Sequence, residues 1–234
     1  MKQKTLLKKL AFNEQDFEDI KNAVTEQEKN TSGEIVLAIA PESSNYAFWK
    51  LLTALFAALI VVGCLIPFTN QIYSYIDLIF MPKRTWVLTT VYVLSGVLVA
   101  FIVYLLYNIP AFNRRVIPLA ARRTAVNNRA LRHFVQSGVY KTSGQTGILI
   151  FVSYFEREIR ILADSGINAK VSQDLWNIVA DEMTDSLTKG RVKEALLGAI
   201  NRCGELLSQN FSADSASKNE LPDGLVILDK ESWV

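Results

Sequence analysis

The stretch that divides this chain in two is LLTALFAALIVVGCLIPFTNQIYSYI, residues 51–76, which contains no charged side chain. A second uncharged stretch covers residues 85–113. A helix needs about 20 apolar residues to cross a bilayer core of about 30 Å, and both stretches are long enough. We therefore predict a transmembrane hairpin with spans at residues 48–68 and 86–107, joined by a short interfacial loop over residues 69–85. The alternative is a buried helical hairpin, but core helices seldom run this long without a polar face.

Basic residues near the two predicted spans indicate the orientation of the hairpin. Two spans place both ends of the chain on the same side of the membrane. The connecting loop contains two basic residues, whereas more of them gather before the first span and after the second (Lys2, Lys4, Lys8, Lys9, Arg114, Arg115, Arg122, Arg123, Arg129 and Arg132). Cytoplasmic segments next to spans carry an excess of lysine and arginine. The sequence therefore predicts a multi-pass protein of a bacterial inner membrane with both termini in the cytoplasm.

The overall composition excludes several classes of protein. Half of the residues are hydrophobic and 21% are charged, with 25 basic and 23 acidic side chains, so the chain is neither wholly disordered nor a polyelectrolyte. Its two cysteines, Cys64 and Cys203, lie outside any CxxC motif and cannot form a disulfide framework. Nucleic-acid binding would require a broader basic surface with stacking aromatic residues, so we expect none.

Outside the hairpin, the pattern is typical of an interrupted α/β domain. Residues 1–46 form its first part, with a helix capped by Asn13 and then a strand over residues 35–40. Residues 47–107 form the hairpin, and residues 108–211 add the rest of the domain in the order helix 116–137, strand 147–154, strand 158–164 and two helices separated by Gly190. A lone strand before the hairpin would be an exposed edge, so it must pair with the strands that follow.

The last part of the chain, residues 212–234, is predicted to be a polar linker and a tail. The apolar residues within 221–228 leave two interpretations open. This segment either adds a strand to the sheet or binds in a groove.

The order of these elements resembles that of a known family. It runs through Gly33-Glu34-Ile35-Val36-Leu37, Gly147-Ile148-Leu149-Ile150, Glu158-Ile159-Arg160-Ile161 and Asp164-Ser165-Gly166-Ile167 to two helices around Lys189-Gly190. Over residues 12–40 and 115–211 this order resembles the TPM domain, the family named for a thylakoid lumen protein, a photosystem II repair protein and a modulator of worm receptors. The resemblance implies an α/β fold, a small mixed sheet with helices on both sides, with the hairpin inserted after the first strand.

The same resemblance implies calcium as a cofactor, because some members of the family are reported to bind it, and a phosphatase activity has been proposed for plant members. The acidic pattern of the family falls on residues 164–173 here, where Asn168 and Gln173 replace two acidic residues. The resemblance then leaves Asp164, Asn168 and Asp174 as the candidate metal ligands. Calcium binds six to eight oxygen atoms, several of them from carboxylates, so the two amides weaken the site.

Other patterns that could support catalysis are incomplete. The lone histidine, His133, has no obvious His or Cys partner, and Gln145 stands where a phosphate-binding loop requires lysine. Glu156 and Glu158 flank Arg157 at a tight turn, where we expect a solvated hairpin tip. The catalytic residues of an enzyme thus stay unknown.

Three arginines after the second span recur every seven residues: Arg115, Arg122 and Arg129. On one helix of 3.6 residues per turn, they lie within about 40° of each other. Such a stripe can contact anionic lipid headgroups, at about 1 kcal/mol for each basic residue. The alternative is that these arginines only set the topology, and the two interpretations are compatible.

The leading prediction is an integral membrane protein that presents a cytoplasmic TPM-like domain as a binding or scaffold module. Its expected partners are the lipid bilayer and other membrane proteins, whose assembly, repair or regulation it would serve. The predicted contact surface is the sheet edge together with the loop over residues 164–173. The alternatives are a metal-dependent phosphatase and a sensor of anionic lipid surfaces.

Overall fold

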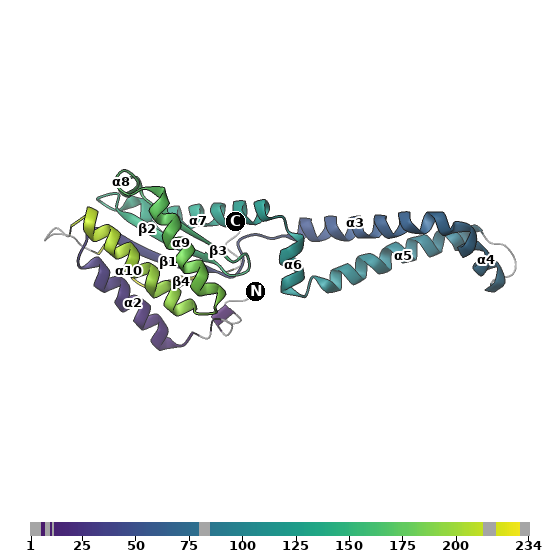
Figure 1. Cartoon of the computed structure of the whole chain (residues 1–234), viewed down its shortest axis with the longest axis horizontal. Coiled ribbons are helices and arrows are strands. Elements are labelled where there is room, and N and C mark those ends of the chain that lie inside the picture. The colour runs from purple at the N-terminus through teal and green to yellow at the C-terminus, as the bar shows by residue number, and fades with distance from the viewer. Residues whose placement is uncertain (1–5, 8–9, 11, 80–84, 213–218, 230–234) are drawn as a thin grey trace. The chain divides into compact units, whose positions relative to one another are not determined.

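The computed structural model describes residues 6–7, 10, 12–79, 85–212 and 219–229. It divides into two compact units, which we treat separately. The first, here called the α/β unit, comprises Met1–Ser44 and Leu119–Val234. The second, here called the helical unit, comprises Asn45–Pro118. Figure 1 labels the helices and strands of both.

A four-stranded mixed sheet forms the centre of the α/β unit, in the order β3-β2-β1-β4. Strand β1 (Glu34–Ala40) pairs in parallel with β2 (Gly147–Ser153), so the strand before the uncharged stretches does pair with one after them. Strand β3 (Glu158–Ala163) is antiparallel to β2. The short β4 (Leu225–Ile227) is parallel to β1, which decides that the tail adds a strand.

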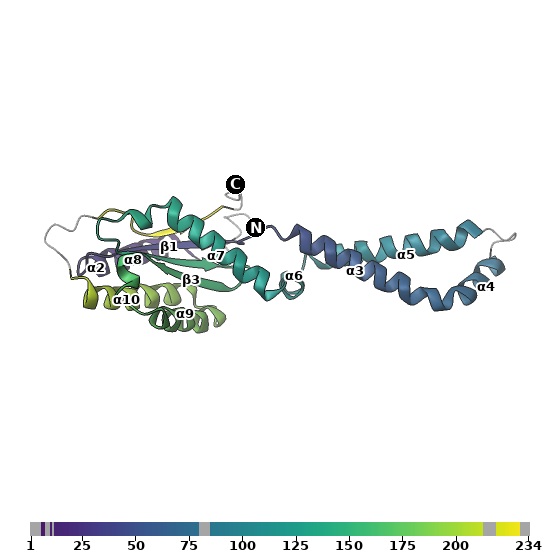
Figure 2. The ribbon, with the colours of Figure 1, turned by 90° about the horizontal axis from the view of Figure 1, so that it is seen from above.

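Both faces of this sheet are covered, because alternate residues of a strand point to opposite sides. Ile35, Leu37 and Ile39 of β1 pack into a core cluster with residues of α2 (Glu14–Glu28), α9 (Gln173–Thr188) and α10 (Val192–Asn210). Val36, Ala38 and Ala40 pack on the other face against α7 (Leu119–Gln136). Figure 2 shows α7 on one side of the sheet and α9 and α10 on the other. The predicted α/β fold with helices on both sides is confirmed.

Local signals set the start of the first long helix. The Asn13 side chain accepts a hydrogen bond from the backbone N–H of Asp16, and the Asp16 carboxylate accepts one from the N–H of Asn13, each at 2.9 Å. This reciprocal cap satisfies two backbone donors that a helix start leaves without partners. Ile20 and Val24 then face the core, as the helical spacing predicts.

The helical unit consists of α3 (Ala47–Leu65), a 3₁₀ turn η1 (Ile66–Phe68), α4 (Thr69–Ile79), α5 (Thr85–Leu106) and α6 (Pro110–Val116). Helices α3 and α5 cover most of the two predicted spans and pack against each other. The prediction of a loop over residues 69–85 is wrong for its first part, which is α4. Pro67 permits this because it lies in the first turn of η1, a position where proline needs no backbone donor. The basic residues of that loop lie outside the described residues.

The helical conformation is interrupted between α6 and α7, so the prediction of one helix over residues 116–137 is wrong at its start. Ile117 is extended, with φ −77° and ψ 123°, because proline at the next position disfavours the helical conformation of the residue before it. The break separates Arg115, on α6, from Arg122 and Arg129, on α7. The seven-residue spacing therefore does not place the three arginines on one helix.

Candidate functional site

Asp164 lies at the end of β3, where it caps the short helix α8 (Ser165–Asn168). Its Oδ1 accepts a hydrogen bond of 2.6 Å from the backbone N–H of Ser165. Its Oδ2 is buried and has no hydrogen-bond partner among the described residues. A Cβ at Gly166 would lie 2.7 Å from the Gln145 carbonyl oxygen, so only glycine lets this loop approach the loop before β2 so closely.

The other two candidate metal ligands are less suited to that role. The Asn168 amide donates a hydrogen bond of 2.7 Å to the carbonyl oxygen of Ala163, so this side chain already holds its own loop. Asp174 is exposed in the first turn of α9. Within the described ranges, no group of three or more His, Cys, Asp or Glu side chains is arranged to hold a metal ion. A calcium site would depend on the free Oδ2 of Asp164 and on oxygens that sequence did not single out.

The three arginines of the predicted lipid contact differ in exposure. Arg115 is exposed, and Arg122 is half-buried, with its guanidinium 3.4 Å from the Glu156 carbonyl oxygen. Arg129 is only 6% exposed, and its Nη2 donates a hydrogen bond of 2.8 Å to the Asp229 carbonyl oxygen in the tail. The expectation for Arg129 is therefore corrected, because its guanidinium is inside the α/β unit and cannot contact a headgroup there.

A buried polar cluster that sequence analysis missed lies at the carboxyl ends of β1 and β2. Glu156 is 1% exposed, although its position in a tight turn predicted a solvated tip. Its carboxylate accepts hydrogen bonds from the backbone N–H of Ser43 at 2.8 Å and from the Ser153 hydroxyl at 2.5 Å. The Ser43 and Ser153 hydroxyls are also 2.5 Å apart. We call these three residues the Ser–Glu cluster; it anchors the loop after β1 just before the helical unit begins.

Four carboxylates gather at the opposite end of β1, beneath the tail; we call Glu28, Glu34, Glu220 and Asp223 the acidic cluster. The Glu28 carboxylate accepts a hydrogen bond of 2.7 Å from the backbone N–H of Ile35. The Glu34 carboxylate accepts one of 3.1 Å from the backbone N–H of Glu220. Sequence analysis could not find this cluster, because its two halves come from opposite ends of the chain.

Burial raises the proton affinity of two members of the acidic cluster, Glu28 and Glu34. Desolvation, together with the nearby carboxylates of Glu34 and Asp223, raises the pKa of Glu28 to about 8. Burial likewise raises the pKa of Glu34, which is 6% exposed. The Oε2 atom of Glu34 has no hydrogen-bond partner in the part of the chain that is described. The Glu28 carboxyl is therefore largely protonated at neutral pH.

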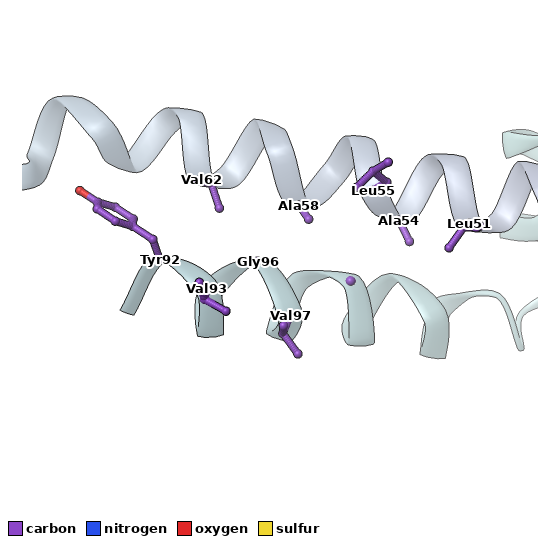
Figure 3. Close-up of a pocket in the computed structure, with 10 residues that line it drawn as sticks. Leu51, Ala54, Leu55, Ala58, Val62, Tyr92, Val93, Gly96 and Val97 are labelled. Atoms are coloured by element: carbon purple, nitrogen blue, oxygen red, sulfur yellow. The ribbon is translucent and has the colours of Figure 1, made fainter. Parts of the chain in front are cut away.

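The helical unit carries an apolar groove of about 440 Å³ between α3 and α5. Figure 3 shows Ala54, Ala58 and Val62 of α3 directed toward α5, whose Gly96 lies opposite them. At one end of the pair, the hydroxyls of Thr69 and Tyr92 are 2.7 Å apart. The continuous helical stretch Ala47–Leu78 and the helix Trp86–Leu106 are each long and apolar enough to cross a membrane.

Comparison with known proteins relates the α/β unit to a family. Residues 115–206 match the TPM domain. The predicted resemblance is thereby confirmed, although the match says nothing of a membrane insertion. Within the TPM match lie α7, β2, β3, Asp164, α9 and most of α10.

One solved structure supports the fold assignment. The NMR structure of the BA42 protein from the psychrophilic bacterium Bizionia argentinensis is 19% identical to this chain, with a TM-score of 0.55. The similarity covers 93% of this chain and 95% of that protein. At this identity it shows the fold alone. Among curated proteins, none matches this chain.

Proposed function

We propose that this protein is a multi-pass protein of a bacterial inner membrane that presents its TPM-like α/β unit to the cytoplasm as a binding module. Its partners would be other membrane proteins, whose assembly, repair or regulation it serves. The observation that carries this proposal is the apolar surface of α3 and α5.

The side chains on that surface are large and exposed. Leu51 is 71% exposed, Phe56 59% and Val97 60%. Soluble proteins rarely expose contiguous apolar patches larger than a few hundred Å², because each Å² left in water costs about 25 cal/mol. A lipid bilayer removes this cost, and the two helices have the length that a bilayer core requires.

A membrane-fractionation experiment tests the proposal. Membranes from cells that produce the full-length chain are washed with alkaline carbonate, which removes proteins held only by surface charge. We expect the chain to stay in the pellet and to enter the supernatant only with detergent. Recovery in the soluble fraction without detergent would overturn the proposal.

A second candidate function, a metal-dependent phosphatase, is favoured by one observation: the Oδ2 of Asp164 is buried, and no described residue forms a hydrogen bond with it. A metal ion there would supply a Lewis acid or an activated water. Calorimetric titration of the purified chain with calcium, and a phosphate-ester assay with calcium or magnesium, test this function. Heat or turnover that the Asp164→Asn variant abolishes would support it, and an absence of both would exclude it.

A further inference from the structure

The helices on the two sides of the sheet differ in charge. Figure 2 shows α7 on one side and α9 on the other. Helix α7 contains four arginines and no acidic residue, whereas α9 contains four acidic residues and no basic one. Helix α2, which packs on the same side of the sheet as α9, adds six acidic residues and one lysine. The α/β unit therefore has a basic side, formed by α7, and an acidic side.

Two aliphatic side chains lie on the side of α7 that points away from the sheet. Val126 and Ala130 are 0% exposed and pack against the strands. On a helix of 3.6 residues per turn, Val135 lies about 180° from Val126 and about 140° from Ala130. It is 55% exposed, and Leu131, one turn before it, is 46% exposed. These two residues form an apolar pair that no other element of the α/β unit buries.

Arginines lie on both sides of this apolar pair. Around the helix, Arg123 is about 80° from Leu131 in one direction, and Arg132 is about 60° from Val135 in the other. Arg132 is exposed. The Arg123 side chain is 59% exposed, and its Nε lies 3.5 Å from the Glu158 carboxylate. A guanidinium has five N–H donors, so most of those of Arg123 stay available. We call Arg123, Leu131, Arg132 and Val135 the α7 outer face.

A membrane surface is the partner that the chemistry of this face fits. Peripheral helices bind bilayers by inserting aliphatic side chains at the headgroup boundary while lysine and arginine contact anionic headgroups. The position of α7 in the chain favours this partner further. Only Ile117 and Pro118 separate α7 from the end of α6, in the helical unit, so a bilayer around α3 and α5 is present at a high effective concentration.

We propose that the α7 outer face docks on the anionic surface of the membrane. Leu131 and Val135 enter the headgroup layer, and Arg123 and Arg132 contact lipid phosphates. Because α9 lies across the sheet, docking leaves its acidic side turned toward the cytoplasm and open to partners. The inference rests on the proposed function, since the cytoplasmic leaflet is the anionic one.

This surface differs from the stripe that the seven-residue arginine spacing predicted. Arg129 of that stripe is buried, Arg122 is half-buried, and Arg115 is on α6. Burial thus moves the expected lipid contact to a different face of α7, which also carries the exposed aliphatic pair.

An environment-sensitive fluorophore tests the docking in the full-length chain, reconstituted with one chain in each nanodisc. The label is attached to Asn128→Cys, an exposed position about 20° from Val135 around α7. The matched control is Asn177→Cys, an exposed asparagine of α9 beside Ile178, which is 47% exposed. The nanodiscs contain either phosphatidylcholine alone or an equimolar mixture of phosphatidylcholine and phosphatidylglycerol.

The two native cysteines do not interfere with this labelling. Exposed Cys64 is replaced by alanine, and Cys203 is 0% exposed, so maleimide reacts at the introduced site. A single chain in each nanodisc also excludes contact with a second copy as a cause of any change in emission.

We expect the label at Asn128→Cys to emit at shorter wavelength in nanodiscs with phosphatidylglycerol than in phosphatidylcholine alone. The label at Asn177→Cys should emit alike in both. At 1 M salt, where the Debye length falls to about 3 Å, the shift at Asn128→Cys should be largely lost. An absence of any shift at Asn128→Cys, or an equal shift at the two sites, would overturn the inference.

Charge variants identify the arginines that carry the docking. Arg123→Gln/Arg132→Gln should lose most of the shift at Asn128→Cys. The control is Lys189→Gln/Arg202→Gln, which removes the same charge from side chains that are 54% and 43% exposed outside α7, and it should keep the shift. Equal losses in the two double variants would contradict a specific role for the α7 outer face.

A variant without the aliphatic pair provides a second test that leaves the charge unchanged. Leu131→Ser/Val135→Ser should also lose most of the shift, and an unaltered shift would contradict insertion of these side chains. Unfolding temperatures measured by circular dichroism show that each variant is folded. The carbonate wash tests membrane integration whatever the lipid charge, so a chain that stays in the pellet but gives no shift would refute the docking alone.

Discussion

Two opposing effects act on the protonation of Glu28. The hydrogen bond from the backbone N–H of Ile35 favours the charged carboxylate, whereas burial and the nearby acidic side chains favour the protonated form. The pKa of Glu28 is about 8 in the folded chain, against an ordinary value of 4.5. The folded state then binds more protons than the unfolded state between these values, so the free energy of unfolding falls as the pH rises from about 5 to about 8.

Glu28→Gln should remove this dependence on pH. The glutamine oxygen can still accept from Ile35, and its amide can donate to Asp223. We expect the variant to have a higher unfolding temperature than the wild type at pH 8 and a similar one at pH 5, measured by circular dichroism in detergent. Glu26→Gln, at an exposed position of the same helix, is the control. Parallel curves for the wild type and Glu28→Gln would contradict this assignment.

Ser153 makes the Ser–Glu cluster continuous, since its hydroxyl contacts both Ser43 and the Glu156 carboxylate. Ser153→Ala removes a donor from a buried carboxylate, which costs about 1–3 kcal/mol of stability. Ser143→Ala removes a similar contact to Glu220 at an exposed site and should cost much less. Denaturant unfolding of both variants compares the two costs. Equal losses would show that the Ser–Glu cluster is not a rigid anchor.

Sequence reveals residue-level contacts only when the partners are near in the chain. The cap formed by Asn13 and Asp16 could be predicted, because three residues separate them and the rule is local. The contact between Glu28 and the tail could not, because nothing in sequence brings residues so distant together. Glu156 was misjudged for a related reason. Arg157 adopts φ +54°, and this turn leaves the Glu156 side chain buried under the loop after β1.

At the scale of elements, the two uncharged helices form a close pair through small residues. A Cβ added at Gly96 would lie 3.4 Å from Val62 Cγ2 and 4.0 Å from the Ala58 Cβ, so this position has room for little more than a methyl group. A Cβ added at Gly63 would meet no described atom within 4 Å. The two glycines therefore offer a matched test of the packing.

Gly96→Leu should force α3 and α5 apart at a cost of about 1–3 kcal/mol. Gly63→Leu should change stability little, because its new side chain would point into open space. Thermal unfolding in detergent, followed by circular dichroism, measures both variants. Equal shifts would mean that the two helices are not packed at Gly96 in the isolated protein.

The bounds of the helices and strands were predicted well where apolar residues follow one another without interruption, and poorly next to proline. The buried strands β1 and β2 follow from their continuous apolar composition. The break before α7 follows from Pro118, a signal that the regular arginine spacing concealed. Pro67 does not end the helical stretch, which continues as η1 and α4. Whether a helix continues past a proline depends on where the proline lies in the helical turn, and the sequence does not show this position directly.

At the scale of the whole molecule, the pairing of β1 with β2 requires the α/β unit to form from two distant segments of chain. Sequence predicted this because a lone strand is an unsatisfied edge. The place of the tail could not be predicted, since three paired residues carry too little pattern to separate a strand from a groove ligand. The acidic cluster forms because β4 pairs with β1, so the cluster could not be predicted either.

The proposed orientation makes a prediction about chemical access from each side of the membrane. Two single-cysteine sites, Asp77→Cys at the end of α4 and Gln209→Cys on an exposed position of α10, are placed in a Cys64→Ala chain. Cys203 can remain, because it is buried and burial raises the pKa of its thiol to about 12, which keeps it unreactive. The only residues under test are then the two introduced ones.

A maleimide that cannot cross membranes should label Asp77→Cys in intact spheroplasts and label Gln209→Cys only after lysis. The reason is that an even number of spans returns the chain to its starting side, and the basic residues flanking the pair favour the cytoplasm. Labelling of denatured protein, minus that of the denatured Cys64→Ala parent, which also contains Cys203, sets the maximum for each site. The reverse pattern would mean that the α/β unit faces outward, and its partners would then have to be sought among extracytoplasmic segments.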